Sequence, residues 1–289
     1  MAKKSLLIGA SGRIGRMVVR AWRSSNHEWS QDPAQYRFDQ QSECQTDLVW
    51  DISKGLDPVG RWMELNGAIT TFIILAGTTP ATGSEMSDNV AIANAYLTAA
   101  RSLGVPRVLL ASSSAVYGAG EGNALAENHP CRPLNAYGAS KVEMELLAQY
   151  FRDEGTELCC LRIGNVAGAD ALLLRAPQAN DRAPLKIDCF PDGHGPQRSY
   201  IGPSSLGSIL GQLAYHDAEL PFLLNVAAPS PVYMEELAEA ADLPWTSRKP
   251  PPHVPQRIVL NCERLAKLVS LETGIGSAST LISEWKRCG

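Results

Sequence analysis

A short apolar run that leads directly into a glycine-rich loop constrains the fold of this chain more than any other feature. Residues 5–8 read SLLI, as a buried strand does, and residues 9–15 continue as GASGRIG. In such a loop Gly9 allows a tight turn, Gly12 lets the backbone approach a pyrophosphate, and Gly15 permits close packing of a helix on the strand. The pattern predicts a strand, a phosphate-binding turn and a helix, with a plain strand-to-helix turn as the alternative.

A second feature is the pair formed by Tyr137 and Lys141, which stand four residues apart in the segment YGASK. On a helix, two side chains with this spacing share one face. A free tyrosine titrates near ~10, and an ammonium group within a few ångströms favours the phenolate, so the pair suits proton transfer at a hydroxyl carbon. The alternative is an exposed tyrosine and lysine on a solvated helix.

A third feature is an apolar strand, residues 107–111, that ends in the three hydroxyls of Ser112, Ser113 and Ser114. Ligands of open parallel sheets sit at the carboxyl ends of the strands, so these serines are expected to face the same crevice as the glycine loop. One of them could hold a substrate oxygen. Capping or turning of the chain is the alternative, and it applies more to Ser112 and Ser114 than to Ser113.

The order of predicted elements indicates an α/β fold with a parallel sheet. Strands are expected near residues 5–8, 47–50, 70–75, 107–111 and 158–163, and helices near residues 13–23, 87–103 and 139–154. In the second half of the chain the predicted elements are shorter and more often interrupted, because proline and glycine recur in residues 176–203 and 249–255. A late strand near residues 222–226, a helix near 233–241 and a helical region from about Cys262 would build a smaller lobe there.

The balance of charge argues against a general attraction to nucleic acid or acidic membranes. Lysine and arginine number 26 against 30 acidic residues, a net charge of -4, so any phosphate site must be local. Seven cysteines lack CxxC spacing and five histidines lack HExxH spacing, so neither a disulfide framework nor a metal site is expected. With no signal peptide and no long apolar run, we expect a cytoplasmic protein.

Taken in order, these motifs resemble the extended short-chain dehydrogenase/reductase family, which contains the NAD-dependent nucleotide-sugar epimerases and dehydratases. The resemblance spans nearly the whole chain. It includes GxxGxxG, SSxxVYG and YxxxK, together with LAG at 75–77, LRIGN at 161–165, RSYI at 198–201 and LNV at 224–226. It implies a Rossmann-type doubly wound parallel sheet in residues 1–165 and a smaller substrate lobe in residues 166–289, with residues 222–226 returning to the sheet.

The resemblance implies a catalytic role for Ser113, Tyr137 and Lys141. Tyr137 would act as the acid/base, Lys141 would lower its pKa and bind the nicotinamide ribose, and Ser113 would hydrogen-bond the substrate oxygen. The activity implied is that of an NAD(P)-dependent epimerase or oxidoreductase acting on a sugar or nucleotide sugar. A non-catalytic NAD(P)-binding sensor is the alternative.

The loop pattern and the resemblance together imply a set of cofactor contacts. They are Gly9, Ser11, Gly12, Arg13, Ile14, Gly15, Asp32, Asp51, Ile52, Leu75, Ala76, Gly77, Asn89, Tyr137, Lys141 and Ile163. Asp32 stands about where an acid would bind the adenine ribose, roughly 20 residues after the loop, which favours NAD. Arg13 and Arg37 could instead meet the 2′-phosphate of NADP. Asp51 resembles the acid that relatives place near the adenine, and capping of the next helix is its alternative.

Substrate contacts are implied for Ser113, Ser114, Asn165 and Arg198. Arginine suits a bidentate grip on a phosphate group. The alternatives are an ion pair with an acid such as Asp192 for Arg198, and a strand-end turn for Asn165.

Two departures from the family narrow the implied reaction. Ser114 and Ala115 stand where sugar dehydratases carry an acid pair, so elimination is disfavoured. The span between Asn165 and Arg198 is short, which favours a substrate smaller than a full nucleotide sugar. We also expect a homodimer through the helices near residues 87–103 and 139–154.

Overall fold

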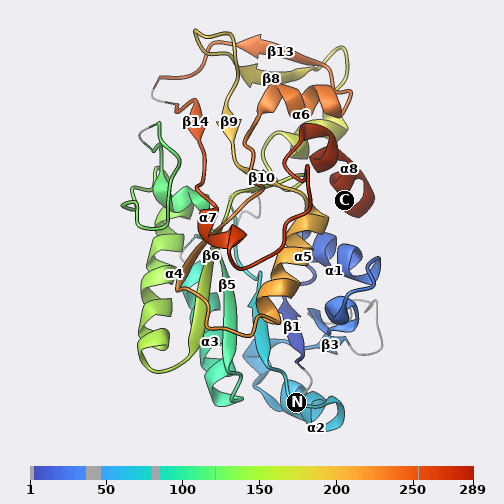
Figure 1. Cartoon of the computed structure of the whole chain (residues 1–289), viewed down its shortest axis with the longest axis vertical. Helices are drawn as coiled ribbons and strands as arrows, with labels where there is room; N and C mark the ends of the chain where they lie inside the picture. The colour runs from blue at the N-terminus through green and yellow to red at the C-terminus, as the bar shows by residue number, and fades with distance from the viewer. Residues whose placement is uncertain (1–2, 37–46, 80–84, 87, 121, 253) are drawn as a thin grey trace.

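A computed structural model describes residues 3–36, 47–79, 85–86, 88–120, 122–252 and 254–289 (Figure 1). Its centre is a parallel sheet of seven strands in the order β11-β6-β5-β4-β1-β2-β3. The strands are β1 Ser5–Ile8, β2 Ala34–Tyr36, β3 Leu48–Val49, β4 Thr71–Ile74, β5 Arg107–Ser113, β6 Glu157–Ile163 and β11 Leu223–Val226. The order confirms the predicted doubly wound sheet, including the return of the late strand to its edge.

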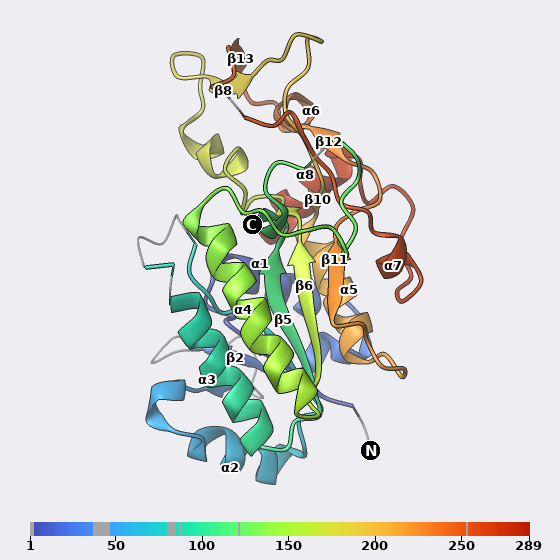
Figure 2. The ribbon, with the colours of Figure 1, turned by 90° about the vertical axis from the view of Figure 1, so that its left-hand side faces the viewer.

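Helices cover both faces of this sheet. On one face lie α1 (Arg13–Arg23) and α5 (Pro203–Ala214), and on the other lie α2 (Asp57–Asn66), α3 (Asp88–Ser102) and α4 (Ala136–Asp153). In Figure 2, α3 and α4 run side by side in front of the sheet. The expected positions of α1 and α3 are therefore confirmed, and α4 lies where it was expected but begins three residues earlier.

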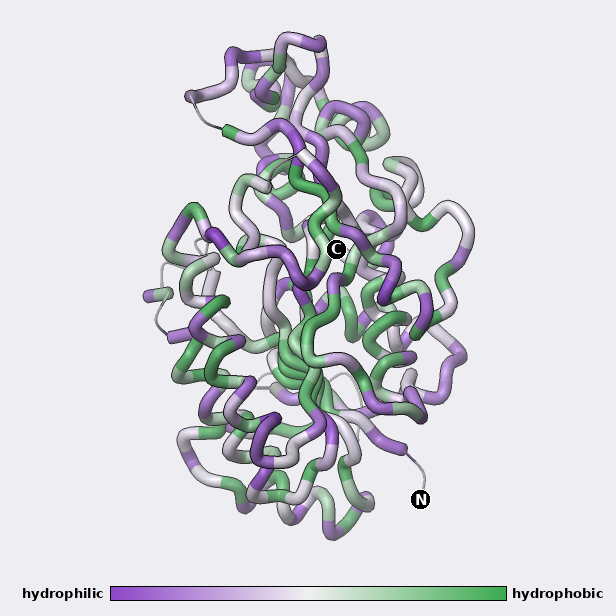
Figure 3. The backbone as a smooth tube through the Cα atoms, turned by 60° about the vertical axis from the view of Figure 1, so that its left-hand side comes forward, coloured by the Kyte–Doolittle hydropathy of each residue, from purple (hydrophilic) through white to green (hydrophobic). Residues whose placement is uncertain are grey.

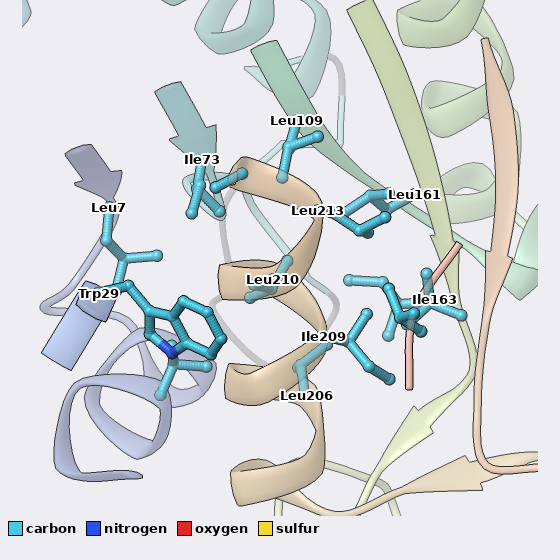
Figure 4. Close-up of a cluster of buried hydrophobic side chains, with 14 of the residues drawn as sticks. Leu7, Trp29, Ile73, Leu109, Leu161, Ile163, Leu206, Ile209, Leu210 and Leu213 are labelled. Atoms are coloured by element: carbon cyan, nitrogen blue, oxygen red, sulfur yellow. The ribbon is translucent and has the colours of Figure 1, made fainter. Parts of the chain in front are cut away.

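The strands are apolar on both faces because helices cover each one. On one face Leu7, Ile73 and Leu109 meet Leu206 and Leu210 of α5, as Figure 4 shows. The alternate residues of the same strands pack against the opposite helices. The strands consequently form a continuous hydrophobic block through the middle of the molecule (Figure 3).

A smaller lobe lies beyond the carboxyl ends of the strands, at the top of Figure 1. Its short strands are β7 Asn165–Val166, β8 Leu185–Asp188, β9 Gln197–Arg198, β10 Tyr200–Ile201, β12 Val232–Tyr233, β13 Trp245–Arg248 and β14 Arg257–Ile258. Its helices are α6 Met234–Ala240 and α8 Ala278–Cys288, whereas the short α7, Glu263–Ala266, packs against β11 at the edge of the large sheet. Beyond residue 165, β11 is still a strand of the large sheet and α5 packs on that sheet. Segments of the large part and of the small lobe therefore alternate along the chain there.

None of the helices in the described ranges is both long enough and apolar enough to span a membrane.

Candidate active site

The glycine loop has the geometry that its sequence predicts. Gly9 has φ +92°, a conformation that favours glycine, and a Cβ there would lie 2.7 Å from the backbone nitrogen of Ala76. The loop closes as the Gly12 N–H donates to the Gly9 carbonyl at 3.0 Å. A Cβ on Gly15 would lie 2.1 Å from that carbonyl oxygen, so only glycine lets α1 approach β1 this closely.

The N-terminus of α1 fits a phosphate group. Gly12 is the N-cap, no side chain caps the helix, and the first turn contains no acidic residue. By contrast, α4 is capped by Asn135, whose side chain accepts from the Gly138 N–H at 2.8 Å. The first N–H groups of α1 are thus available to an anion, next to the half-buried Ser11 and Ile14 and the exposed Arg13.

Asp32 does not lie at the cofactor end of the sheet, which corrects its predicted role. The run before it folds into a 3₁₀ helix at Glu28–Gln31, and β2 begins only at Ala34. The buried Asp32 carboxylate accepts from Ser5 N at 2.9 Å and from the Tyr215 hydroxyl at 3.2 Å. Ser5 begins β1, whereas the glycine loop follows its other end, so Asp32 is a structural acid whose pKa burial raises.

Asp51 and Ile52 do lie at the carboxyl end of β3. The Asp51 carboxylate accepts from Ser53 N at 3.0 Å and from Ser53 Oγ at 2.8 Å, at the start of a 3₁₀ helix, Ile52–Lys54. The capping alternative is therefore confirmed, and contact with an adenine stays a prediction. Arg37, the other candidate for a 2′-phosphate, lies outside the described residues.

Asn89 holds the loop after β4 in place. Its Oδ1 accepts from Thr78 N at 2.9 Å, and its Nδ2 donates to the Thr78 carbonyl at 3.2 Å and to Ser140 Oγ at 3.1 Å. A Cβ on Gly77 would lie 2.8 Å from the same Oδ1. Since its oxygen and both amide hydrogens have partners within the chain, Asn89 positions the Leu75–Gly77 edge, and the predicted direct cofactor contact is not supported.

The structure brings Ser113, Tyr137 and Lys141 together at the carboxyl edge of the sheet. Ser113 ends β5, its side chain lies near enough to the Tyr137 phenol to lower the pKa of that phenol, and its Oγ accepts from Ala115 N at 3.2 Å. Lys141 Nζ lies 5.9 Å from the centre of the Tyr137 ring and donates to the Ala111 carbonyl at 3.0 Å. One phenol, one hydroxyl and one amine thus converge as the sequence predicts.

Burial governs the pKa values of this group. It lowers the pKa of Lys141 to about 8, against weaker opposing effects of Cys160 and Glu145. It also raises the pKa of Tyr137, although the hydrogen bond from Ser113 lowers it. The expected lowering of the Tyr137 pKa by Lys141 is not found, because desolvation of the phenol dominates and the opposing effect comes from Ser113.

A close fit between α4 and the 3₁₀ helix that follows β5, Ser114–Tyr117, sets the position of Tyr137. A Cβ on Gly138 would lie 2.5 Å from the Ala115 carbonyl oxygen, and Ser140 Oγ donates to the Tyr137 carbonyl at 2.9 Å. The cap residue Asn135 was not singled out from the sequence. An asparagine directly before a helical segment is nevertheless a recognisable start signal.

A buried polar network behind the site was also missed by the sequence reasoning. Glu145 accepts from Ser112 Oγ at 2.6 Å and from Arg162 Nη2 at 2.7 Å. The Arg162 guanidinium lies 4.8 Å from the centre of the Tyr117 ring, whose hydroxyl donates to Asn225 Oδ1 at 2.7 Å. The network joins α4 to β5, β6 and β11, and Ser112 acts in it as a structural residue.

The predicted substrate residues lie beyond the end of β6. Asn165 begins β7, which pairs with β10, and Arg198 ends β9, two positions before β10 begins. Ser114 is half-buried at the start of a 3₁₀ helix, Ser114–Tyr117, and Ile163 pairs with Ser113 in the β5–β6 register. These positions are next to the carboxyl edge that carries Ser113.

Arg198 does not form the ion pair that was its alternative. It donates to the Gln256 carbonyl at 2.5 Å and to the Pro255 carbonyl at 2.8 Å. Asp192 instead accepts from Gln256 Nε2. The guanidinium therefore ties the proline-rich connector to β9, and its desolvation lowers its pKa.

In the part of the chain that the structure describes, no three histidine, cysteine or acidic side chains group in a way that could hold a metal ion. The six cysteines described are free thiols.

The fold and the site together define a dinucleotide-binding α/β protein. The model of the NAD dependent epimerase/dehydratase family matches residues 5–196, and the chain belongs to this family.

Two characterised relatives share only part of their sequence with it. A UDP-glucose 4-epimerase from Azospirillum brasilense is 40% identical over 87 residues, which are 29% of this chain and 24% of that enzyme. One from Corynebacterium glutamicum is 37% identical over 83 residues, 28% of this chain and 25% of that enzyme. The matched segment thus spans about a quarter of each relative.

Solved structures match the whole fold. A UDP-glucose-4-epimerase from Stenotrophomonas maltophila, with bound NAD and formylated UDP-arabinopyranose, superposes with a TM-score of 0.79 at 17% identity, covering 99% of this chain and 98% of that one. The UDP-Glc/GlcNAc 4-epimerase from Campylobacter jejuni gives 0.78 at 18% identity, covering 99% of both chains. At these identities the likeness establishes the fold.

Proposed function

We propose that this chain is an NAD-dependent enzyme that oxidises and reduces a hydroxyl carbon of a sugar or nucleotide sugar, as an epimerase or an oxidoreductase does. This proposal rests on the convergence of Ser113, Tyr137 and Lys141 at the edge of the sheet that also bears the glycine loop and the uncapped N-terminus of α1. The relatives, which are UDP-glucose 4-epimerases, and the NAD and UDP-sugar held by a structural neighbour support it.

The chain's own residues would divide the chemistry between them. Bound NAD would supply the acceptor and donor of the hydride. Tyr137 would take the hydroxyl proton of the substrate and return it, while Ser113 holds the oxygen. Lys141, whose pKa of about 8 leaves it charged at neutral pH, would stabilise the phenolate electrostatically.

The glycine loop and the first turn of α1 would hold the pyrophosphate of the cofactor. With Asp32 at the other end of the sheet, the argument from that acid no longer favours NAD over NADP. The preference now rests on the NAD in the neighbouring structures.

Asn165 and Arg198 would contact the phosphate-bearing part of the substrate. Arg198 would reach it by exchanging neutral carbonyl partners for an anion, which favours a charged group there. Ser114 and Ala115, the neighbours of Ser113, offer no carboxyl group, and this continues to disfavour elimination of water.

The second copy in a homodimer would pack on α3 and α4. Leu146 and Tyr150, one turn apart on α4, are 68% and 57% exposed. A cytoplasmic location stays a prediction, and the free thiols fit a reducing compartment.

The first experiment is to denature the purified protein and identify the released nucleotide by mass spectrometry. Retained NAD supports an epimerase cycle, in which the nicotinamide is reduced and reoxidised within one turnover. NADP would direct attention to reductase assays instead. Purified protein that binds neither nucleotide contradicts the proposal.

The activity is tested with Tyr137→Phe, which removes the acid/base and leaves the ring. We expect turnover of UDP-glucose or UDP-galactose, or of other sugars in a panel, to fall by roughly 10²–10⁴-fold, while the Kd for NAD stays within about twofold. Tyr150→Phe on the same helix is the matched control and should retain full activity. If Tyr137→Phe keeps the wild-type rate, the assignment is wrong; if the wild type binds NAD but turns over no substrate, a sensor is the better description.

A further inference from the structure

The side chain of Gln35 bridges the ends of the two strands that flank β2. Its Oε1 accepts from the Gly9 N–H at 3.1 Å, and its Nε2 donates to the carbonyl of Trp50. Gly9 opens the glycine loop after β1, and Trp50 directly precedes Asp51 after β3. The side chain is almost completely buried, with the residue 1% exposed.

Packing alone does not call for an amide at this position. The neighbouring strand residues Leu7, Ile8 and Leu48 are apolar, and a buried amide is costly to desolvate unless its hydrogen bonds are made. The parallel register pairs Ile8 with Gln35, and the chain then leaves the ladder at Gly9 with φ +92°. The Gln35 oxygen supplies the partner that the Gly9 N–H would otherwise lack at the start of the loop.

We propose that Gln35 is a positioning residue for dinucleotide binding. By joining Gly9 to Trp50 it fixes the phosphate loop relative to the end of β3, the two places from which the pyrophosphate and the adenosine would be held. This inference rests on the proposed function, since it concerns the same cofactor. Its role requires one acceptor and one donor in a single side chain, which is what an amide provides.

That requirement separates Gln35 from its closest isosteres. In Gln35→Glu the ionised carboxylate can accept from Gly9, but it places an oxygen against the Trp50 carbonyl. Protonation restores a donor toward Trp50, so a glutamate should replace the amide only at low pH. In Gln35→Met the space is filled and both hydrogen bonds are lost at every pH.

The charged groups on the described elements around β2 are the same in all variants. Asp51 follows β3, and Asp47, which pairs with Arg23 at 2.8 Å, precedes it. Their titration therefore cancels when a variant is compared with the wild type.

Gln212, on α5, provides a control glutamine. Its amide also makes one hydrogen bond as acceptor, from Ser270 N, and one as donor, to the Ser270 carbonyl.

The experiment measures the Kd of NAD and of NADP by calorimetry between about pH 5.5 and 8.5, a range in which a buried carboxyl group changes from protonated to ionised. The subjects are the wild type, Gln35→Glu, Gln35→Met and Gln212→Glu, each with a thermal melt. We expect Gln35→Met, which loses both hydrogen bonds, to bind the dinucleotide roughly tenfold more weakly at every pH, because the glycine loop is no longer held in place. Gln35→Glu should be at least as weak at high pH and regain affinity as the pH falls, whereas Gln212→Glu should follow the wild type.

Two results would overturn the inference in distinguishable ways. If the wild type binds NAD or NADP and both Gln35 variants bind it equally well at all pH values, the positioning role is wrong and the proposed function stands. If the wild type binds neither nucleotide, the proposed function fails and this inference fails with it. Loss of affinity through unfolding is recognised by the melts. Because an ionised carboxylate at this buried position can also destabilise the fold, affinities are compared only at pH values where each variant is folded, and Gln35→Met tests the role without a charge.

Discussion

At the scale of single residues, the sequence predicts those roles that depend on short chain spacing. Tyr137 and Lys141 are fixed relative to each other by helix geometry, and Ser113 by the end of an apolar strand, so their convergence could be foreseen. The prediction that Asp32 contacts the adenine ribose was wrong, because it depended on where β2 begins. A 3₁₀ helix delays that strand, and the acid consequently precedes it.

Gln35, by contrast, is a residue whose role cannot be predicted from short chain spacing. No sequence pattern marks it, because a lone glutamine in a short strand looks like an ordinary polar residue. Its contacts join residues 26 positions before it and 15 after it, which only the three-dimensional register brings together.

Lys141 leads to a prediction about stability and pH. Its folded pKa is about 8 and its ordinary value is 10.5, so between these values the unfolded chain binds more protons than the folded one. The free energy of unfolding of the wild type, relative to Lys141→Met, should therefore rise with pH across this window by roughly 3 kcal/mol and stay constant below it.

Urea denaturation of both proteins from pH 6.5 to 10.5, a window set about the lysine pKa values, measures that difference. Taking the difference removes the titration of the buried tyrosines, which both proteins share. Parallel curves for the two proteins would show that Lys141 keeps an ordinary pKa in the folded state.

At the scale of elements, capping and close packing decide where α4 begins. The sequence placed its start near residue 139, whereas the helix begins at Ala136 because Asn135 caps it. The difference brings Tyr137 into the first turn, where Gly138 lets the helix approach the Ala115 carbonyl. Local signals thus define the helix, but its fit against β5 is a tertiary property.

The buried pair Glu145 and Arg162 fastens α4 to β6, and it leads to a second stability prediction. Their side chains are 6% and 4% exposed, so removing one charge leaves the other desolvated without its counter-ion. We expect Glu145→Gln to lower the free energy of unfolding by about 3 kcal/mol. Adding Arg162→Met should cost less than the sum of the two single changes.

Chemical denaturation of the two single variants and the double variant measures this coupling. The exposed pair of Arg101 and Glu154, which also joins α3 to α4, serves as the control, and Glu154→Gln should change stability by less than about 1 kcal/mol. Strictly additive costs at Glu145 and Arg162 would mean that the two charges do not depend on each other.

At the scale of the whole molecule, the large sheet was predictable and the small lobe was not. Six of the seven strands lie at apolar runs that the sequence predicts, because helices cover both faces of the sheet, whereas β2, with the sequence AQY, carries no such run. In the lobe, β9 has two residues and pairs with β12 and β14, which lie far along the chain. Strands this short carry no periodicity, so their partners emerge only from the assembled fold.

The outer face of α4 concerns the assembly beyond one chain. The helix buries Met144, Ala148 and Phe151 toward the core, whereas Leu146 and Tyr150, one turn apart, are large apolar side chains exposed on another side. Exposed apolar side chains that adjoin each other on a helix are typical of a protein interface.

We therefore expect a homodimer at micromolar concentration, and Leu146→Glu should shift it to monomers, because each interface would have to bury unpaired carboxylates on both copies. Sedimentation velocity over a range of concentrations gives the mass of each species. Leu65, 85% exposed on α2, provides the control, since Leu65→Glu adds the same charge on a different helix and should leave the dimer intact. A monomeric wild type, or equal dimerisation of both variants, would exclude this face as the interface. Loss of the dimer only in Leu146→Glu, with an unchanged melting temperature, would locate the contact on α4.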